Sequence, residues 1–170
     1  DVRVVRHLTN QGLGGVYRTG FREAARDMVT FFPADGQFPA SIIEQFVPLV
    51  AECDLVLGHL PDRGGSLAAL LSQAERLLYR LMFGAFPRFQ GIMLFRREIL
   101  DRIELTSTGR GWGVVMELII RASRAGFRIR SEPTTWRPRN QGRSRVLNPR
   151  TIWSLAAQNA SPVRWNPNIE

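Results

Sequence analysis

A carboxylate, a glycine and an amide follow one another directly after an apolar, aromatic run in Phe31-Phe32-Pro33-Ala34-Asp35-Gly36-Gln37-Phe38. The run predicts a buried strand, and an open α/β sheet binds its ligands beyond the carboxyl ends of its strands. There the Asp35 carboxylate can bind a cation, and Gly36 lets a bulky ligand approach the backbone. Taken alone, this segment favours an ordinary strand-to-helix turn with Asp35 as its cap, because Asp-Gly is common turn chemistry.

The elements that must position Asp35 alternate between strand and helix. Hydrophobic periodicity predicts strands over residues 2–6, 28–32, 54–58, 90–95 and 127–131. It predicts helices over residues 18–27, 41–52, 66–83, 96–102, 114–125 and 151–158. Pro48 predicts a kink or break in its helix, and Gly126 a C-cap. This alternation predicts an α/β layered sheet, and we expect Asp35 at the carboxyl end of a central strand.

The composition of the chain limits the number of domains and the kinds of partner that it can have. Its 170 residues fit one domain, the formal net charge is +8, and all 23 basic residues are Arg. This charge favours anionic partners such as nucleotide phosphates, phospholipid headgroups or nucleic acid. The single cysteine, Cys53, excludes an internal disulfide and fits a reducing compartment. The sequence begins at Asp1 without Met and enters an apolar run at once, so we expect it to be a piece of a longer protein.

Four separated segments together resemble one family. They are Asn10-Gln-Gly-Leu-Gly-Gly-Val-Tyr-Arg-Thr-Gly20, Ala34-Asp-Gly-Gln37, Gly91-Ile-Met-Leu-Phe-Arg-Arg97, and Glu117-Leu-Ile-Ile-Arg-Ala122 followed by Gly126-Phe-Arg-Ile129 and Arg139-Asn-Gln-Gly-Arg-Ser-Arg145. In this order and spacing, they resemble the motifs of family 2 glycosyltransferases of the dolichyl-phosphate mannosyltransferase or polyprenyl-phosphate sugar synthase type.

The resemblance implies a GT-A fold, a Rossmann-like sheet with flanking helices, here truncated at its N-terminus. It places the glycosyltransferase domain at residues 1–158 and a tail at residues 159–170. The family's first strands, which hold the nucleoside, have no counterpart in the sequence. We therefore expect this piece alone to be inactive and to bind a nucleotide-sugar weakly.

The resemblance also implies site residues. Asp35 matches the second acid of the family's D-A-D-G-Q motif, which implies a catalytic role and a Mg²⁺ or Mn²⁺ ligand at the donor diphosphate. Pro33 replaces the first acid, which leaves one obvious carboxylate and puts the affinity for a cation in question. Gln37 is implied to hydrogen-bond the sugar or the diphosphate.

Basic residues are implied to bind donor or acceptor phosphate. Arg18 follows Gly14-Gly15 at the start of a helix, although simple packing of a loop onto that helix explains the glycines as well. Arg63 takes the place of an Arg that the family often has where Leu60 stands. A basic loop contributes Arg139, Arg143, Ser144 and Arg145, for which a solvated surface loop is the alternative.

Glu117 lies on an otherwise apolar helix face, where a buried acid needs a partner. Either it pairs structurally with an Arg or it faces the acceptor site. We assign it to the catalytic set as a positioning group, because the oxygen of a polyprenyl phosphate is already an anionic nucleophile. Trp112 and Trp136 either stack on a sugar or base, or pack.

The leading hypothesis is an inverting hexosyltransferase of the bacterial cell envelope. It would use a nucleotide-sugar donor and a polyprenyl-phosphate or similar lipid-linked acceptor at the anionic inner face of the membrane, in the cytoplasm. One alternative is a catalytically inactive relative, which Pro33 suggests. Another is a basic nucleic-acid-binding module, but aromatic residues are not interleaved with the Arg residues, so no nucleic-acid partner is expected.

Overall fold

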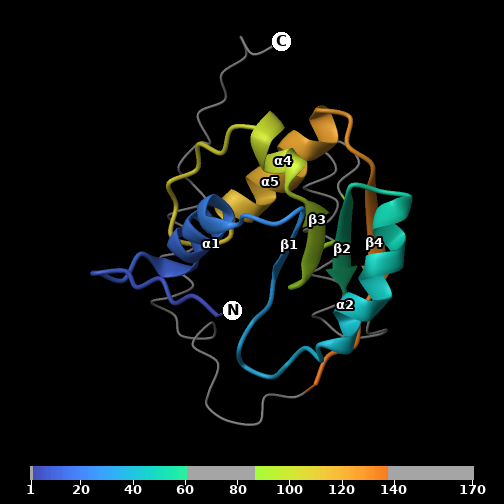
Figure 1. Cartoon of the computed structure of the whole chain (residues 1–170), viewed down its shortest axis with the longest axis horizontal. Coiled ribbons are helices and arrows are strands. Elements are labelled where there is room, and N and C mark those ends of the chain that lie inside the picture. Colours follow the sequence, from blue (N-terminus) through green and yellow to red (C-terminus); the bar gives the residue numbers. More distant parts are fainter. Residues whose placement is uncertain (1, 61–86, 138–170) are drawn as a thin grey trace, which may run out of the picture. The chain divides into compact units, whose positions relative to one another are not determined.

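The computed structural model describes residues 2–60 and 87–137 of the chain (Figure 1). The chain divides into two compact units. One consists of residues 1–23, 104–119 and 143–170, and the other of residues 24–103 and 120–142. The second unit contains the sheet, and the first contains a twelve-residue helix, Gly12–Glu23, with a loop packed on its start.

The second unit is built on a mixed four-stranded sheet in the order β1-β3-β2-β4. Its strands are β1 (Met28–Phe31), β2 (Leu55–His59), β3 (Met93–Arg96) and β4 (Ile129–Pro133). Strand β3 pairs antiparallel with both β1 and β2, and β4 pairs parallel with β2. The carboxyl ends of β1, β2 and β4 therefore lie at one end of the sheet, where β3 begins.

An apolar core lies between this sheet and helix α2 (Ser41–Phe46), which Figure 1 shows beside β2 and β4. Ile42 and Phe46 of α2 are buried against Val56 of β2 and Leu94 of β3. Helix α2 gives way at Val47 to a 3-10 helix, η1 (Val47–Ala51), with Pro48 in its first turn. The break predicted at Pro48 is confirmed, because proline cannot donate the next helical hydrogen bond.

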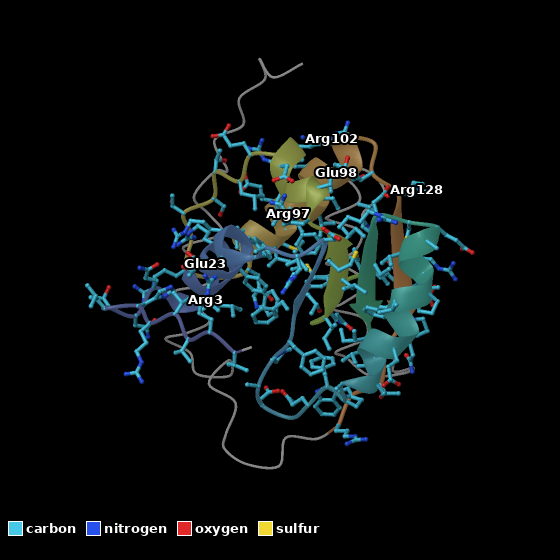
Figure 2. All side chains as sticks on the ribbon, viewed as in Figure 1. Arg3, Glu23, Arg97, Glu98, Arg102 and Arg128 are labelled. Atoms are coloured by element: carbon cyan, nitrogen blue, oxygen red, sulfur yellow. The ribbon has the colours of Figure 1, made fainter. Side chains whose placement is uncertain are left out.

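At the amino end of β2, an acidic side chain ties β2 to the entry of β4. The Asp54 carboxylate accepts hydrogen bonds from the Arg128 backbone N–H at 2.8 Å and from Arg128 Nη2 at 3.1 Å. The side-chain hydrogen bond from Arg128 is the main reason that the pKa of Asp54 is lowered. The Arg102 guanidinium of helix α4 (Glu98–Arg102) lies 5.0 Å from the centre of the Phe127 ring, next in sequence to Arg128; Figure 2 labels both arginines.

The first unit contains helix α1 (Gly12–Glu23) and the loop that leads into helix α5 (Gly113–Arg124). Tyr17 of α1 is buried, and its ring lies 5.6 Å from that of Trp112. At the end of α1, Arg3 forms an ion pair with Glu23 at 2.8 Å (Figure 2).

Three predictions about the elements are wrong. Residues 2–6 form no strand, and Val2 and Val4 are 96% and 73% exposed. Helix α1 begins at Gly12 instead of residue 18, because contacts with a distant loop override the low helix propensity of its glycines. Among the described strands β1 lies at the edge of the sheet, not at its centre, because β3 occupies the position between β1 and β2. The helices predicted over 66–83 and 151–158 lie outside the described residues.

Candidate functional site

Polar side chains gather beyond the carboxyl ends of β1, β2 and β4. Asp35 and Gln37 follow β1, His59 ends β2, and Trp136 follows β4. Gln90 approaches from the other direction, ahead of β3, and its side-chain oxygen accepts a hydrogen bond from the Leu60 N–H at 3.0 Å. The sheet thus brings Asp35, Gln37 and Trp136, which lie up to about a hundred residues apart in sequence, to one end of one compact unit.

Asp35 stands in a turn four residues beyond β1, and its side chain is exposed. Oδ1 of Asp35 accepts a hydrogen bond from the Gln37 backbone N–H at 3.2 Å, a local bond that is typical of Asp in turns. Gly36 has φ of 72°, a conformation that L side chains rarely adopt, and a Cβ there would meet no atom within 4 Å. The turn therefore requires the glycine, and the space beside it is open.

The Gln37 side chain connects Asp35 to Trp136. Its amide satisfies both neighbours when the nitrogen faces Asp35 and the oxygen faces the indole. Nε2 of Gln37 then donates to Asp35 Oδ2 at 2.9 Å, and Oε1 accepts from Trp136 Nε1 at 2.9 Å. Both oxygens of the Asp35 carboxylate are thus hydrogen-bonded to Gln37.

The segment that carries Trp136 is fixed to the sheet. Thr134 is 3% exposed, and its N–H donates to the His59 carbonyl at 2.7 Å. Three residues later, the Arg137 N–H donates to the Gln37 carbonyl at 2.8 Å. The turn after β1 is therefore attached through backbone and side-chain bonds to the segment after β4.

The residues at this end of the sheet fit a divalent cation that is shared with a phosphate ligand. Among residues 2–60 and 87–137, no group of three or more His, Cys, Asp or Glu side chains could hold a metal ion alone. Asp35 offers a carboxylate, a hard oxygen donor, and Gln37 holds that carboxylate through both of its oxygens. Mg²⁺ is commonly bound through one or two carboxylates together with substrate phosphates, so one exposed carboxylate is compatible with such a site.

Arg18 and Glu117, both predicted site residues, hold one loop of the first unit. Nη1 of Arg18 donates to the Gly109 carbonyl at 2.9 Å and to the Ser107 carbonyl at 3.3 Å. The Glu117 carboxylate, 5% exposed, accepts from the N–H groups of Thr106 and Ser107 at 2.9 and 2.7 Å and from the Thr106 hydroxyl at 2.8 Å. Ser107 is thus bound through its N–H by one residue and through its carbonyl by the other.

The glycines before Arg18 are explained by packing. The Gly14 N–H donates to the Arg110 carbonyl at 2.9 Å, and a Cβ on Gly14 would lie 2.1 Å from the Gly109 oxygen. A Cβ on Gly12 would lie 2.6 Å from the Arg110 oxygen. Of the two explanations that the sequence left open, this geometry supports a loop packed closely on the start of α1.

The other predicted phosphate-binding residues lie outside the described part of the chain: Arg63, Arg139, Arg143, Ser144 and Arg145. Sequence reasoning considered Trp136 only as a stacking or packing residue and missed its hydrogen bond to Gln37. No local signal could have revealed that bond, because strands β2, β3 and β4 lie between the two residues in the sequence.

Comparison with known families and curated proteins gives consistent matches. Residues 1–104 match the model of "Glycosyl transferase family 2". The chain is 30% identical to an undecaprenyl-phosphate mannosyltransferase of Micrococcus luteus, over 93% of this chain and 73% of that protein. It is 24% identical to a dolichol-phosphate mannosyltransferase of Pyrococcus furiosus, over 99% of this chain but only 50% of that protein.

Solved structures agree on the fold. A glucosyl-3-phosphoglycerate synthase from Mycobacterium tuberculosis, crystallised with Mn²⁺, uridine diphosphate and glucosyl-3-phosphoglycerate, superposes with a TM-score of 0.58 at 21% identity. The match covers 89% of this chain and 56% of that one. A second crystal of that synthase, with Mg²⁺ and uridine diphosphate, gives a TM-score of 0.57 at 22% identity over the same shares of the two chains. The expected GT-A-type α/β fold is confirmed.

No described helix is both long and apolar enough to cross a bilayer.

Proposed function

Because this chain belongs to glycosyl transferase family 2, we propose that the protein transfers a sugar from a nucleotide-sugar donor to a polyprenyl phosphate or a similar lipid-linked phosphate. The observation that carries the proposal is Asp35, an exposed carboxylate held in a defined orientation beyond the carboxyl end of β1. The named acceptors of the two mannosyltransferases, undecaprenyl phosphate and dolichol phosphate, support the acceptor class. The chain spans 73% of the first of these relatives and half of the second, so the activity of the whole protein is part of the proposal.

The reaction forms a bond between an acceptor phosphate oxygen and the anomeric carbon of the sugar. The bond from that carbon to the donor diphosphate breaks, and the nucleoside diphosphate leaves with the electron pair. The acceptor oxygen is already anionic, so the step needs no strong general base. The main requirement is neutralisation of the charge that develops on the diphosphate.

Asp35 would meet that requirement together with a divalent cation. The cation, when bound, supplies a Lewis acid at the leaving diphosphate. Asp35 supplies one carboxylate and Gln37 holds that carboxylate in place. Pro33 stands where the family's motif has its first acid, so the diphosphate oxygens themselves would complete the coordination.

Glu117 and Arg18 would act by positioning a loop. Glu117 accepts hydrogen bonds from N–H groups of the loop 106–109, and Arg18 donates hydrogen bonds to its carbonyl groups. This supports the positioning role for Glu117 and does not require either residue to touch phosphate. Phosphate contacts are proposed instead for Arg63, Arg139, Arg143 and Arg145, whose guanidinium groups suit bidentate binding of phosphate oxygens. Ser144 would donate a single hydrogen bond from its hydroxyl. A lipid-linked acceptor and the net charge of +8 support work at the anionic inner membrane face.

The test is transfer of labelled sugar from guanosine and uridine diphosphate sugars to undecaprenyl phosphate by the intact protein with Mn²⁺ or Mg²⁺. We expect label in the lipid phase with at least one donor, and none when the free polyprenol replaces its phosphate. A chelator should stop the reaction. Binding of Mn²⁺ and donor without transfer to any polyprenyl phosphate would favour the inactive relative that Pro33 suggests.

A further inference from the structure

We propose that Trp136 is a positioning residue that orients the Asp35 carboxylate through the side chain of Gln37. The inference rests on the proposed function, in which Asp35 binds the cation of the donor diphosphate. It concerns a residue 101 positions away in sequence, on the segment after the last described strand. The catalytic chemistry proposed above gives Trp136 no role.

The direction of the hydrogen bonds carries the argument. An indole Nε1–H can only donate, whereas an amide has a donating and an accepting end. The indole of Trp136 therefore draws the oxygen of the Gln37 amide toward itself at 2.9 Å. The amide nitrogen is then turned toward Asp35 Oδ2, also at 2.9 Å. The Asp35 carboxylate can only accept and the indole can only donate, so both favour the same orientation of the amide, and the indole bond holds the Gln37 side chain where its nitrogen reaches Oδ2.

The relay holds both oxygens of the Asp35 carboxylate. The carboxylate is exposed, and Gly36 next to it leaves free space. The backbone N–H of Gln37 holds Oδ1 and the side-chain amide holds Oδ2, which together fix the rotation of the carboxylate. A carboxylate oxygen can accept more than one bond, so both oxygens keep the capacity to bind a cation.

Trp136 can serve as a fixed point because its backbone is anchored on both sides. Buried Thr134 binds the end of β2, and the Arg137 N–H binds the Gln37 carbonyl. A Cβ on Gly58 of β2 would lie 2.8 Å from the Thr134 methyl group, so this segment packs directly on the strand. Partners of this kind, one step removed from a ligand, typically change metal affinity or activity about 10- to 100-fold when they are lost.

The first measurement is the affinity of the intact protein for Mn²⁺ in the presence of saturating uridine or guanosine diphosphate, monitored by the paramagnetic resonance of the free ion. Trp136→Phe keeps an aromatic ring and removes the N–H donor. Trp112→Phe is the matched control, because Trp112 is also a partly exposed tryptophan but packs on Tyr17 in the other unit. We expect Mn²⁺ affinity to fall about 10- to 100-fold in Trp136→Phe and to stay unchanged in Trp112→Phe. Unchanged affinity in both variants would overturn the inference.

The second measurement detects the hydrogen bond itself. The indole N–H signal in a ¹H–¹⁵N spectrum that disappears in Trp136→Phe is assigned to Trp136. It should shift upfield in Gln37→Leu, which keeps the approximate shape of Gln37 and removes its acceptor. A signal that does not respond to Gln37→Leu would contradict the relay.

The two proposals fail in different ways. A wild-type protein that binds Mn²⁺ more tightly than Trp136→Phe, yet transfers no sugar, would leave the positioning role intact and remove the proposed function. A wild-type protein that binds no Mn²⁺ even with a nucleoside diphosphate present would contradict both. Transfer activity that is fully retained in Trp136→Phe at limiting Mn²⁺ would contradict the positioning role alone.

Discussion

Two carboxylates from the same predicted site have opposite surroundings. Glu117 is 5% exposed and accepts three hydrogen bonds from two consecutive residues of one loop. Asp35 is exposed and is hydrogen-bonded to Gln37 through both of its oxygens, in a turn with open space beside Gly36. The first arrangement stabilises a loop, and the second presents a charge to solvent in a fixed orientation.

This difference suggests that two residues predicted for one site have different roles: Glu117 supports the folded structure, and Asp35 is placed to bind a ligand. A buried carboxylate whose oxygens accept hydrogen bonds from backbone N–H groups contributes to stability. Its removal leaves those N–H groups without this acceptor. An exposed carboxylate contributes little to stability, so its orientation calls for another explanation. Each of the following substitutions tests one side of this contrast.

Asp35→Asn should have the largest effect on activity. The amide oxygen can still accept the bond from the Gln37 N–H, but the charge that balances a cation is lost. We expect sugar transfer by the intact protein to fall below detection with Mn²⁺ or Mg²⁺ present. The free energy of unfolding in urea should change by no more than about 0.5 kcal/mol. Near-normal turnover would remove Asp35 from the mechanism.

Glu117→Ala should have the largest effect on stability. The loss of a buried acceptor of three hydrogen bonds should lower the free energy of unfolding by about 2–4 kcal/mol. The control is Glu104→Ala, which removes an exposed carboxylate close to the same loop and should change stability by no more than about 0.5 kcal/mol. If Glu117→Ala abolished transfer without altering unfolding, Glu117 would belong with Asp35 as a group that contacts ligand.

Two glycines of helix α1 provide a matched pair. A Cβ on Gly14 would lie 2.1 Å from the Gly109 carbonyl oxygen, whereas a Cβ on Gly20 would meet nothing within 4 Å. Gly14→Ala should therefore destabilise the protein by about 1–3 kcal/mol through overpacking against backbone. Gly20→Ala should stabilise it by about 0.5–1 kcal/mol, because alanine loses less backbone entropy in a helix. Thermal unfolding of both variants would show whether the loop packs on α1 as closely as described.

Local patterns in the sequence predicted the elements that depend on nearby residues alone, through a continuous apolar face or a single residue that ends a helix. Strands β1 and β2, the break at Pro48 and helix α5 with Gly126 at φ of 80° agree with expectation within about two residues. The strand predicted over residues 2–6 is wrong because Val2-Arg3-Val4 resembles a half-buried strand in sequence, although these Val side chains are exposed. The place of β3 between β1 and β2 could not be predicted, because strand order depends on contacts between distant segments.

The same division between local patterns and distant contacts applies to the candidate site. Asp35 and Gln37 could be singled out because the apolar run before them is local, and their roles at a donor diphosphate stay predictions. The loop-holding roles of Arg18 and Glu117 depend on residues 89 and 11 positions away respectively, and neither follows from spacing. The roles of Arg63, Arg139, Arg143, Ser144 and Arg145 stay predictions.

The smallest effect concerns Asp54, at the end of the sheet opposite Asp35. Its folded pKa is lowered, mainly by the hydrogen bond from Arg128, so its contribution to stability is present above its unfolded pKa of about 4. That contribution is lost as the pH falls through the folded pKa. Urea unfolding should show Asp54→Asn less stable than the wild type near neutrality, with the difference shrinking as the pH falls below about 4. A difference that is constant with pH would mean that packing, not charge, holds β2 to β4 at this point.

The strand order also has a consequence for how the chain folds as it leaves the ribosome. Strand β3 lies between β1 and β2 in space, yet it is the last of the three to be synthesised. Until residues 93–96 emerge, the apolar strands β1 and β2 have no partner between them. Unpaired apolar strands are prone to associate with other chains, so a nascent chain that pauses before Met93 is the form most in need of a chaperone.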